Sequence, residues 1–547
     1  MQKHSEGQQA RVVAAALKAL GIDNFLLGIQ DAAFPALPEE DTGCGSPYSD
    51  GAAGFLEFVR ALGFNGLQLG PQGITARADA SPYDGTLFPR NPLSLAPLRL
   101  SRLPGNLLPP GEITALVNRG PIGTARVDVA SAARYIRTIT DLVRGRFRRL
   151  GGLQKGPVEP RLVRPYLAFR RRNAAWLERD GLYEILKAGY GGKNWQEWDG
   201  GAQARLDRTL FAPPAGTGQA AQKRIGELSG PHRAALEDYC FIQYLLAGQH
   251  DELRSLCENL GLKLFGDCQI GLSDRDAWYA QGFLLDDYLM GAPPSRTNSE
   301  GQPWNYPVFD PRRYYLATPA GTRRPGPVLR FLRGERVDKL FTEYDGLRID
   351  HPHGLICLWV YRAADQDRIQ AVRTGARLFA SPNLADHPGL AKFAIPRPEQ
   401  IDLEAARYDD NWVRGLDPEQ VCRQAAYLAE RLAIPERARP IWTEDLLADP
   451  GALAQAKFTD LFVGPGRNIM VFFTDLLGIE EVYNRPGAVG PDNWSLRIEP
   501  DYRRTYRERS ARRRDLNIPK ALALALRAGG PACRDQHRDL IDDLENY

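Results

Sequence analysis

Two carboxylates stand out among the residues of this chain that could do chemistry. Asp350 follows a short apolar-flanked run, residues 347–349, and Glu444 lies in a short segment further along the chain. Arg348 precedes Asp350 by two positions, so on a β-strand both side chains would point to the same side. A guanidinium group there would keep Asp350 ionised at neutral pH. The alternative is an ion pair between Arg348 and Asp350 that has only a structural role.

A pair of carboxyl groups can cleave a glycosidic bond with retention of configuration. One group acts as the nucleophile and the other as the acid and base, provided that they lie about 5–5.5 Å apart. Asp350 and Glu444 could meet this condition if they lay at the ends of two neighbouring strands that face one cleft. Judged by spacing alone, two separate structural ion pairs explain the two residues equally well.

The two carboxylates belong to a set of short apolar segments, most of which end in polar or charged residues. There are seven: 24–31, 64–71, 262–270, 346–351, 439–447, 458–464 and 469–475. Amphipathic, helix-like stretches lie between most of them, and this alternation indicates a parallel sheet. Because the polar residues are at the strand ends, the leading prediction is an α/β fold of the (β/α)8 TIM-barrel type. A closed barrel needs eight strands, so the count of seven leaves open an irregularity near the seventh strand.

We expect the whole chain, 1–547, to form one catalytic barrel domain with two insertions. Residues 100–235 carry long charged helical patterns with little strand pattern, which predicts an inserted helical subdomain. Residues 287–340 are rich in Pro, Gly, Asn and Arg and predict a long loop region over the active site. Loops of that length inside a compact domain usually serve function.

The overall composition is that of a soluble globular protein, with 43% hydrophobic and 25% charged residues. A net charge of +3, from 70 basic and 67 acidic residues, gives no reason to expect nucleic acid or a membrane as partner. The seven cysteines contain no CxxC pair, so neither a disulfide framework nor a zinc site is predicted. The N-terminus lacks the pattern of a signal peptide, and a cytoplasmic protein is the simplest expectation.

Seven motifs occur in the same order as in one known enzyme family. They are SPYSDGAAGFLEFVRALGFNGLQLGPQG (46–73), ASPYDGTLFPRNPLSL (80–95), GDCQIGLSDRDAW (266–278), GAPPSRTNSEGQPWNYPVFD (291–310), LRIDHPHGL (347–355), TEDL (443–446) and YNRPGAVGPDNWSLR (483–497). With these motifs the chain resembles the amylomaltase or 4-α-glucanotransferase family, the disproportionating enzymes of glycoside hydrolase family 77. Each motif alone is weak evidence, whereas seven in the right order are highly specific.

The resemblance implies a role for each residue at a matching position. Asp350 would be the nucleophile that forms a glucosyl-enzyme intermediate, Glu444 the acid and base, and Arg348 the partner of the nucleophile. Other residues would contact the sugar: His351 in the donor subsite, Tyr83 at the bond being cleaved, Asp267 at sugar hydroxyls and Trp304 with its aromatic face. Structural roles are the alternatives for Asp267, Tyr83 and Trp304. This chemistry requires no metal and no cofactor.

One feature of the family is missing. Its members carry a third catalytic carboxylate after a histidine, and this chain has no histidine between His387 and His537. The segment NIMVFFTDLLG, 468–478, has two interpretations. Asp475 replaces the missing aspartate, or the segment is the family's later strand and the seventh strand has been lost. The second interpretation matches more residues and agrees with the count of seven strands.

The predicted function is transfer of α-1,4-glucan segments between malto-oligosaccharides by a retaining double displacement, as in a 4-α-glucanotransferase. The alternatives are a glucan-binding protein with a degenerate catalytic site and a divergent α-glucan hydrolase. The missing histidine–aspartate motif supports the binding protein, whereas the presence of Asp350, Arg348 and Glu444 argues against it.

Overall fold

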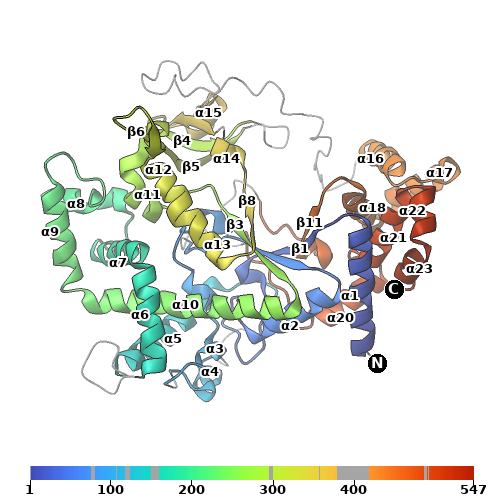
Figure 1. The fold of residues 1–547 in the computed structure, drawn as a ribbon, viewed down its shortest axis with the longest axis horizontal. Coiled ribbons are helices and arrows are strands. Elements are labelled where there is room, and N and C mark those ends of the chain that lie inside the picture. The colour runs from blue at the N-terminus through green and yellow to red at the C-terminus, as the bar shows by residue number, and fades with distance from the viewer. Residues whose placement is uncertain are drawn as a thin grey trace.

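A parallel five-stranded sheet lies at the centre of the structure, a computed structural model (Figure 1). The structure describes residues 2–75, 81–105, 107–117, 124–149, 159–294, 298, 300–356, 358–378, 418–485, 490 and 492–547. The strand order is β11 (Asn468–Phe472), β1 (Asn24–Ile29), β2 (Gly66–Leu69), β3 (Lys263–Cys268) and β8 (Gly346–Ile349). These strands fall in five of the seven predicted segments.

Almost every side chain on the central strands β1 and β2 is buried. In β1 five of the six residues are buried, and in β2 all four are. A strand that is covered on both faces reads as a continuous apolar run. Phe25 of β1 stacks on Phe64 with ring centroids 4.1 Å apart, and Phe462 packs edge-on against it at 5.6 Å. The sheet and the surrounding helices therefore share one core.

The sheet forms an open half-barrel, with β11 and β8 as its two edges. Ile349 on β8 is 51% exposed and Met470 on β11 is 41% exposed. Apolar side chains on the strands of a closed barrel pack between the sheet and the helices around it. The fold is α/β and of the TIM-barrel type, as predicted, and the irregularity lies between these two edges.

Two predicted strands are helices instead, so this part of the prediction is wrong. Residues 439–447 lie in α17 (Arg439–Ala448), and residues 458–464 lie in α18 (Pro450–Val463). Both helices have a proline in the first turn, and the Asp449 side chain caps α18 by accepting a hydrogen bond from Gly451 N at 2.9 Å. With α16 (Pro418–Arg431) they enclose a small apolar core of their own.

The predicted loop over 287–340 contains regular structure, so that prediction is also wrong in part. An antiparallel sheet has the strand order β10 (Ala376–Arg377), β9 (Trp359–Arg362), β4 (Leu284–Ala292) and β5 (Gln302–Phe309). A two-stranded sheet, β6 (Tyr315–Ala317) and β7 (Arg323–Pro325), follows. Next come α12 (Pro327–Leu329), the π-helical turn η7 (Arg330–Val337) and α13 (Asp338–Glu343), which leads into β8.

Helices fill the long connection between β2 and β3. They are α3 (Pro97–Leu100), α4 (Pro110–Val117), α5 (Val129–Arg149), α6 (Pro160–Arg172), α7 (Ala174–Gly189), α8 (Gly201–Arg208), α9 (Gly218–Ser229) and α10 (Arg233–Leu260). Within the described part of 100–235 there is no strand of the three sheets. The division into a separate subdomain at these positions stays a prediction.

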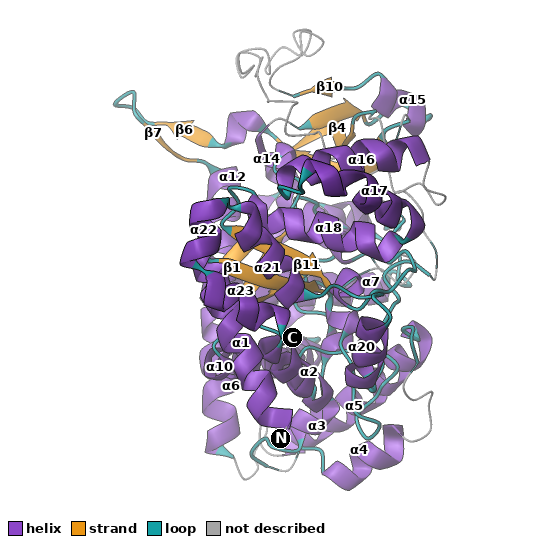
Figure 2. Cartoon of the chain, turned by 90° about the vertical axis from the view of Figure 1, so that its right-hand side faces the viewer, coloured by secondary structure: helices purple, strands orange, loops and turns teal. Residues whose placement is uncertain are grey.

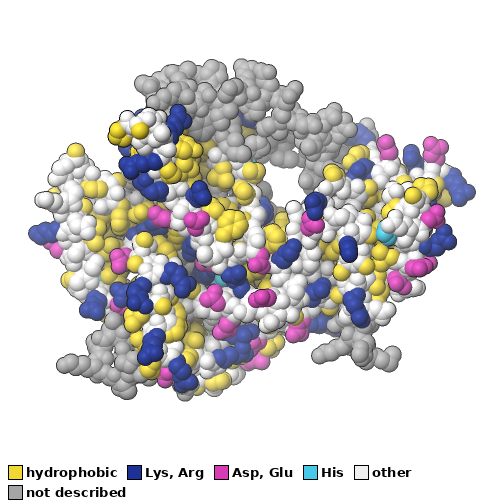
Figure 3. Space-filling model, viewed as in Figure 1, with side chains coloured by type: hydrophobic (Ala, Val, Ile, Leu, Met, Phe, Trp, Pro, Cys, Tyr) yellow, Lys and Arg dark blue, Asp and Glu magenta, His cyan; other side chains and the backbone are white. Residues whose placement is uncertain are grey.

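The structure has ten further α-helices among the described residues, most of which are labelled in Figure 2. They are α1 (Gln2–Ala19), α2 (Asp50–Ala61), α11 (Asp274–Ala280), α14 (His353–Ile356), α15 (Arg368–Arg373), α19 (Phe473–Leu476), α20 (Tyr502–Ala511), α21 (Ile518–Ala528), α22 (Pro531–Gln536) and α23 (Arg538–Glu545). Basic and acidic side chains are interspersed on the face shown in Figure 3. Among the helices whose residues are described, none is both long and apolar enough to cross a bilayer.

Candidate active site

Arg348 joins two carboxylates at the carboxyl ends of adjacent parallel strands. Its Nη2 donates to Asp350 Oδ1 at 2.7 Å, and its Nη1 donates to Asp267 Oδ2 at 2.6 Å. The pairing of β3 with β8 places Asp267 level with Arg348, which explains how residues 81 positions apart in the chain meet. The predicted contact between Arg348 and Asp350 is present, and Asp267 belongs to the same cluster.

Asp267 is held in place by three hydrogen-bond donors. Besides Arg348, the Tyr83 hydroxyl donates to Asp267 Oδ2 at 3.2 Å, and Gln68 Nε2 lies 3.3 Å from the same oxygen. Tyr83 lies on the short turn η2 (Pro82–Asp84), and Gln68 lies within β2. Gln68 is not among the predicted site residues, although an amide inside the apolar strand GLQL is a recognisable signal.

Burial separates the chemistry of the two carboxylates. The Asp267 side chain is 1% exposed, whereas the Asp350 side chain is 24% exposed. Burial raises the pKa of Asp267 to about 6, against the lowering effect of Arg348. Asp350 is therefore the carboxylate that a substrate could reach, and Asp267 is an anchor behind it.

The other two polar groups of the cluster keep their protons. Burial, and then the negative charge of Asp267, raises the pKa of the Tyr83 hydroxyl above its ordinary value. Burial opposes the charge of Arg348, but Asp267, Tyr83 and Asp350 raise the pKa of Arg348 above its ordinary value. Tyr83 and Arg348 are thus hydrogen-bond donors over the whole physiological pH range.

The antiparallel sheet lies against the end of β8. His351 has φ +40°, which turns the chain sharply after Asp350. Its ring meets Trp304 of β5 edge-on, with ring centroids 4.9 Å apart. From the same strand, the Tyr306 hydroxyl donates to Asp84 Oδ1 at 2.6 Å. The structure thus brings His351 and Trp304 to the cluster, and part of the 287–340 region borders it.

A row of aromatic rings extends from the cluster toward β11. Tyr83 packs against Trp494 with ring centroids 5.6 Å apart, and Trp494 packs edge-on against Tyr483 at 5.4 Å. Tyr483 in turn contacts Phe473, which directly follows β11, at 5.3 Å. Trp494 lies in one of the seven motifs but is not among the predicted site residues. Its half-buried ring is a surface on which a sugar ring could stack.

Glu444 does not lie at a strand end, so its predicted position beside Asp350 is wrong. It is exposed on α17, which packs against α16 and α18. In Figure 1, α17 is at the right-hand end of the molecule, whereas β8 is in the centre. The cause is local, because the segment RPIWTEDLLA forms a helix instead of a strand. The catalytic role of Glu444 stays a prediction.

Asp475 is also separated from Asp350. It lies in α19, directly after β11, and its side chain is exposed. In the sheet, β1, β2 and β3 lie between β11 and β8. Because β11 pairs with β1, this arrangement agrees with the interpretation in which 468–478 is the last strand and an earlier strand is lost. A catalytic role of Asp475 stays a prediction as well.

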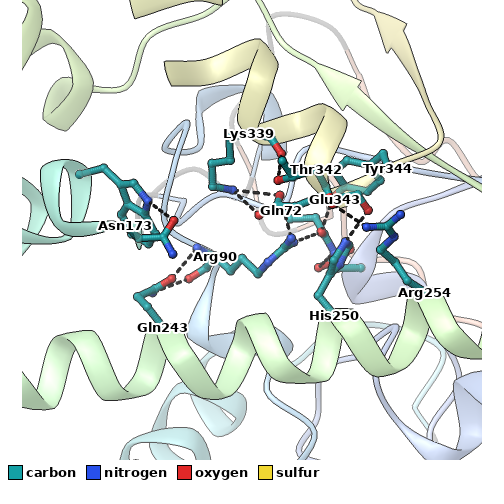
Figure 4. A network of polar contacts seen from close by, with 12 residues as sticks. Gln72, Arg90, Asn173, Gln243, His250, Arg254, Lys339, Thr342, Glu343 and Tyr344 are labelled. Carbon is teal, nitrogen blue, oxygen red and sulfur yellow. Dashed lines mark hydrogen bonds and ion pairs between the residues drawn. The ribbon is translucent and has the colours of Figure 1, made fainter. Parts of the chain in front are cut away.

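A buried network of charged groups fixes the start of β8 (Figure 4). Arg90 Nη2 and Lys339 Nζ each lie 2.8 Å from a carboxylate oxygen of Glu343. Burial opposes ionisation of Glu343, but Arg90, Lys339 and His250 lower its pKa to about 2. The next residue, Tyr344, donates its hydroxyl to Gln72 Oε1 at 2.5 Å. Since Glu343 and Tyr344 precede β8, this network positions the strand that carries Arg348 and Asp350.

Comparison with known proteins gives one consistent family. The family model described as 4-alpha-glucanotransferase, glycoside hydrolase family 77, matches residues 33–446 of the 547. The 4-alpha-glucanotransferase of Thermus thermophilus is 28% identical over 329 residues, which cover 57% of each chain. A chloroplastic or amyloplastic 4-alpha-glucanotransferase of Oryza sativa subsp. japonica is 25% identical over 194 residues, 34% of this chain and 28% of the relative. The match thus spans little more than half of the first relative and less of the second.

Solved structures with a similar fold are amylomaltases. The amylomaltase from Streptococcus agalactiae in complex with acarbose has a TM-score of 0.63 at 16% identity, covering 91% of this chain and 99% of that one. The amylomaltase from Corynebacterium glutamicum has a TM-score of 0.57 at 14% identity, covering 92% of this chain and 76% of that one. At these identities the likeness supports the fold alone.

Proposed function

Because the chain belongs to the 4-α-glucanotransferase family, glycoside hydrolase family 77, we propose that it transfers α-1,4-glucan segments between malto-oligosaccharides. The observation that carries this proposal is the position of Arg348 between Asp350 and Asp267 at the ends of β8 and β3. Such a cluster supplies an accessible carboxylate that is paired with a guanidinium, and a retaining mechanism needs an accessible carboxylate as its nucleophile.

In the proposed reaction, Asp350 attacks the anomeric carbon of the donor glucan. The glycosidic bond breaks, the leaving glucan takes a proton from the catalytic acid, and Asp350 becomes a glycosyl ester. A hydroxyl of the acceptor glucan then attacks the same carbon, gives its proton to the conjugate base and releases Asp350. Two inversions leave the new linkage in the α configuration.

Transfer prevails over hydrolysis when an acceptor hydroxyl is held in place and water is not. Holding reactants in the correct geometry is worth several kcal/mol, about 7–11 kcal/mol in the best cases. Trp304 beside His351 and Trp494 beside Tyr83 provide aromatic faces on two sides of the cluster. We assign them to the donor and acceptor glucan chains.

Glu444 is the proposed acid and base, since its segment matches the family motif. Asp267 has a raised pKa, but it is buried and held by three donors, so it cannot reach a leaving group. In the structure α17 lies away from the strand ends, so the assignment of Glu444 rests on the family motif alone. The variant Glu444→Gln tests this assignment, because an unchanged rate of transfer would remove Glu444 from the mechanism.

The experiment that tests the function is incubation of the full chain with maltotriose, followed by separation of the products by length. A ladder of longer and shorter malto-oligosaccharides is the expected result. Glucose and maltose alone would show a hydrolase, and unchanged maltotriose would show a binding protein. We propose a cytoplasmic location, which is supported by the six described cysteines all being free.

A further inference from the structure

A second cavity lies away from the Arg348 cluster, among helices at the right-hand side of Figure 1. Its walls come from α17, α18, the end of α20 and the start of α21, and its volume is about 690 Å³. Small-molecule sites in proteins have volumes of roughly 300–1,000 Å³ and combine apolar walls with a few polar groups. We call this cavity the helical groove.

One carboxylate oxygen in the helical groove lacks a hydrogen-bond partner among the described residues. Asp515 is 7% exposed, and its Oδ2 has no partner among the described residues. Burial raises the pKa of Asp515 to about 6, although hydrogen bonds from Ser510 and Tyr506 lower it. A buried polar atom without a partner costs about 1–3 kcal/mol. At the wall of a cavity, such an atom is a place where a ligand would form a hydrogen bond.

The backbone next to Asp515 is fixed, so the carboxylate is held in position. Gln455 Nε2 donates to Asn517 O at 2.8 Å, and Asn517 N donates to Gln455 Oε1 at 2.9 Å. The Asn517 side chain caps α21 by accepting from Lys520 N at 2.8 Å. These bonds tie the segment that carries Asp515 to α18 and α21.

The side chains of the helical groove suit a neutral ligand rich in hydroxyls. Its polar lining combines the carboxylates of Asp445, Asp449 and Asp515 with the cationic groups of Arg513 and Lys520. The carboxylates disfavour an anion, and the cationic groups disfavour a cation. Trp442 adds an aromatic ring, against which the apolar face of a sugar ring can pack. Hydroxyls both donate and accept, as this mixed lining requires.

We propose that the helical groove binds a malto-oligosaccharide, so that one chain holds glucan at two separate places. The choice of this sugar rests on the proposed function. Trp442 packs against a glucose ring, Asp515 accepts a hydrogen bond from a hydroxyl, and Lys520 donates one. A long glucan bound here is kept near the enzyme while its end reacts at Asp350.

Titration calorimetry of the full chain with maltoheptaose tests this proposal. All proteins in the titration carry Asp350→Asn, which stops turnover of the sugar, and wild type here means that the groove is unchanged. We expect two molecules bound per chain in the wild type. Asp515→Asn and Lys520→Ala should each weaken one of the two by about tenfold, which is typical of a lost charge-assisted hydrogen bond. Trp442→Ala should abolish binding of the molecule in the helical groove. The matched control is Asp542→Asn, on the exposed face of α23 and outside the groove.

Three results would overturn the proposal: no second molecule in the wild type, equal binding in Asp515→Asn and Asp542→Asn, or unchanged binding in Trp442→Ala. Lys520 is exposed on the first turn of α21, so Lys520→Ala provides the test if Asp515→Asn does not fold. Failure of the proposed function is a different result. In that case maltotriose gives no ladder, while the groove variants still lose one bound maltoheptaose.

Discussion

At the scale of single residues, the site is defined by one guanidinium that serves two unequal carboxylates. Arg348 binds Asp350 and Asp267 at nearly the same distance, 2.7 and 2.6 Å. Only Asp350 has appreciable contact with solvent, with 24% of its side chain exposed against 1% for Asp267. The difference in burial supports the proposed roles, with Asp350 as the reacting carboxylate and Asp267 as its support.

Asp350→Asn should abolish transfer from maltotriose and leave the protein folded. Loss of a catalytic nucleophile lowers turnover by roughly 10³-fold or more. We expect the midpoint of thermal unfolding to change little, because the side chain is partly exposed. The matched control is Asp365→Asn, an exposed aspartate beyond the site. Transfer by Asp350→Asn at more than a few per cent of the wild-type rate would rule out this nucleophile.

The pKa of Asp267 predicts how stability depends on pH. Its folded-state pKa, about 6, is above the ordinary value of 3.8, so the folded protein binds the proton more tightly. The contribution of this group to stability is complete below pH 3.8 and is lost as the pH rises through 6. In Asp267→Asn this loss, up to about 3 kcal/mol, should be absent.

Denaturant unfolding of the wild type and Asp267→Asn at pH 4, 5 and 6 measures the effect. The quantity of interest is the difference between the two curves, since other buried carboxyls such as Asp31 and Asp180 contribute equally to both. Parallel curves would show that Asp267 does not titrate in this range.

At the scale of helices and strands, the burial pattern decided which predictions were correct. The segments that became β1 and β2 are mostly apolar, with Asn24 and Gln68 as the polar residues inside the strands, and the structure confirms them as buried strands. The segments 439–447 and 458–464 also contain charged residues, and they are too short for periodicity to separate a strand from a helix. Their helix signals were present in the sequence: one proline in the first turn of each helix, and Asp449 as the cap of α18.

The site shows the same division between local and long-range information. Arg348 and Asp350 are two positions apart, so their contact could be predicted from the sequence. Only the resemblance to the family predicted that Asp267 and Tyr83 belong to the site. In the structure both residues contact Arg348. Gln68 and Trp494 were missed because their partners lie on distant segments, which no local pattern identifies.

The packing of α18 against the central sheet can be tested with two neighbouring residues. Phe462 is 2% exposed and packs against Phe25 and Phe458, whereas Leu461 is 48% exposed. Phe462→Ala should therefore lower the free energy of unfolding by about 3–5 kcal/mol, and Leu461→Ala by less than about 1 kcal/mol. Chemical denaturation measures both values. Similar losses for the two variants would contradict this packing of α18.

At the scale of the whole molecule, the half-barrel separates two places with different chemistry. The Arg348 cluster lies at the strand ends of the central sheet, and the helical groove lies among the helices at one end (Figure 1). The aromatic row from Tyr83 through Trp494 to Tyr483 leads from the cluster toward β11. β8 and β11 are the two edges of the sheet, so the row leads from the cluster near one edge toward the strand at the other edge.

The exposed edge at β11 predicts tolerance to a polar substitution. Met470 is 41% exposed, whereas its neighbour Val471 is 5% exposed. Met470→Gln should change the free energy of unfolding by no more than about 0.5 kcal/mol, whereas Val471→Asn should cost about 2–4 kcal/mol. Equilibrium unfolding in urea compares the two. A large loss for Met470→Gln would mean that this edge is covered in solution.

The shared guanidinium has a consequence for the second half of the reaction cycle. When Asp350 carries the sugar as an ester, it has lost its negative charge, and it no longer raises the pKa of Asp267. Asp267 then becomes a stronger acid and keeps Nη1 of Arg348. The bond from Nη2 to Asp350 would weaken at the same step, because its acceptor would be a neutral ester oxygen instead of a carboxylate. In the proposed cycle the guanidinium would thus be held mainly by Asp267 until the acceptor restores the charge of Asp350.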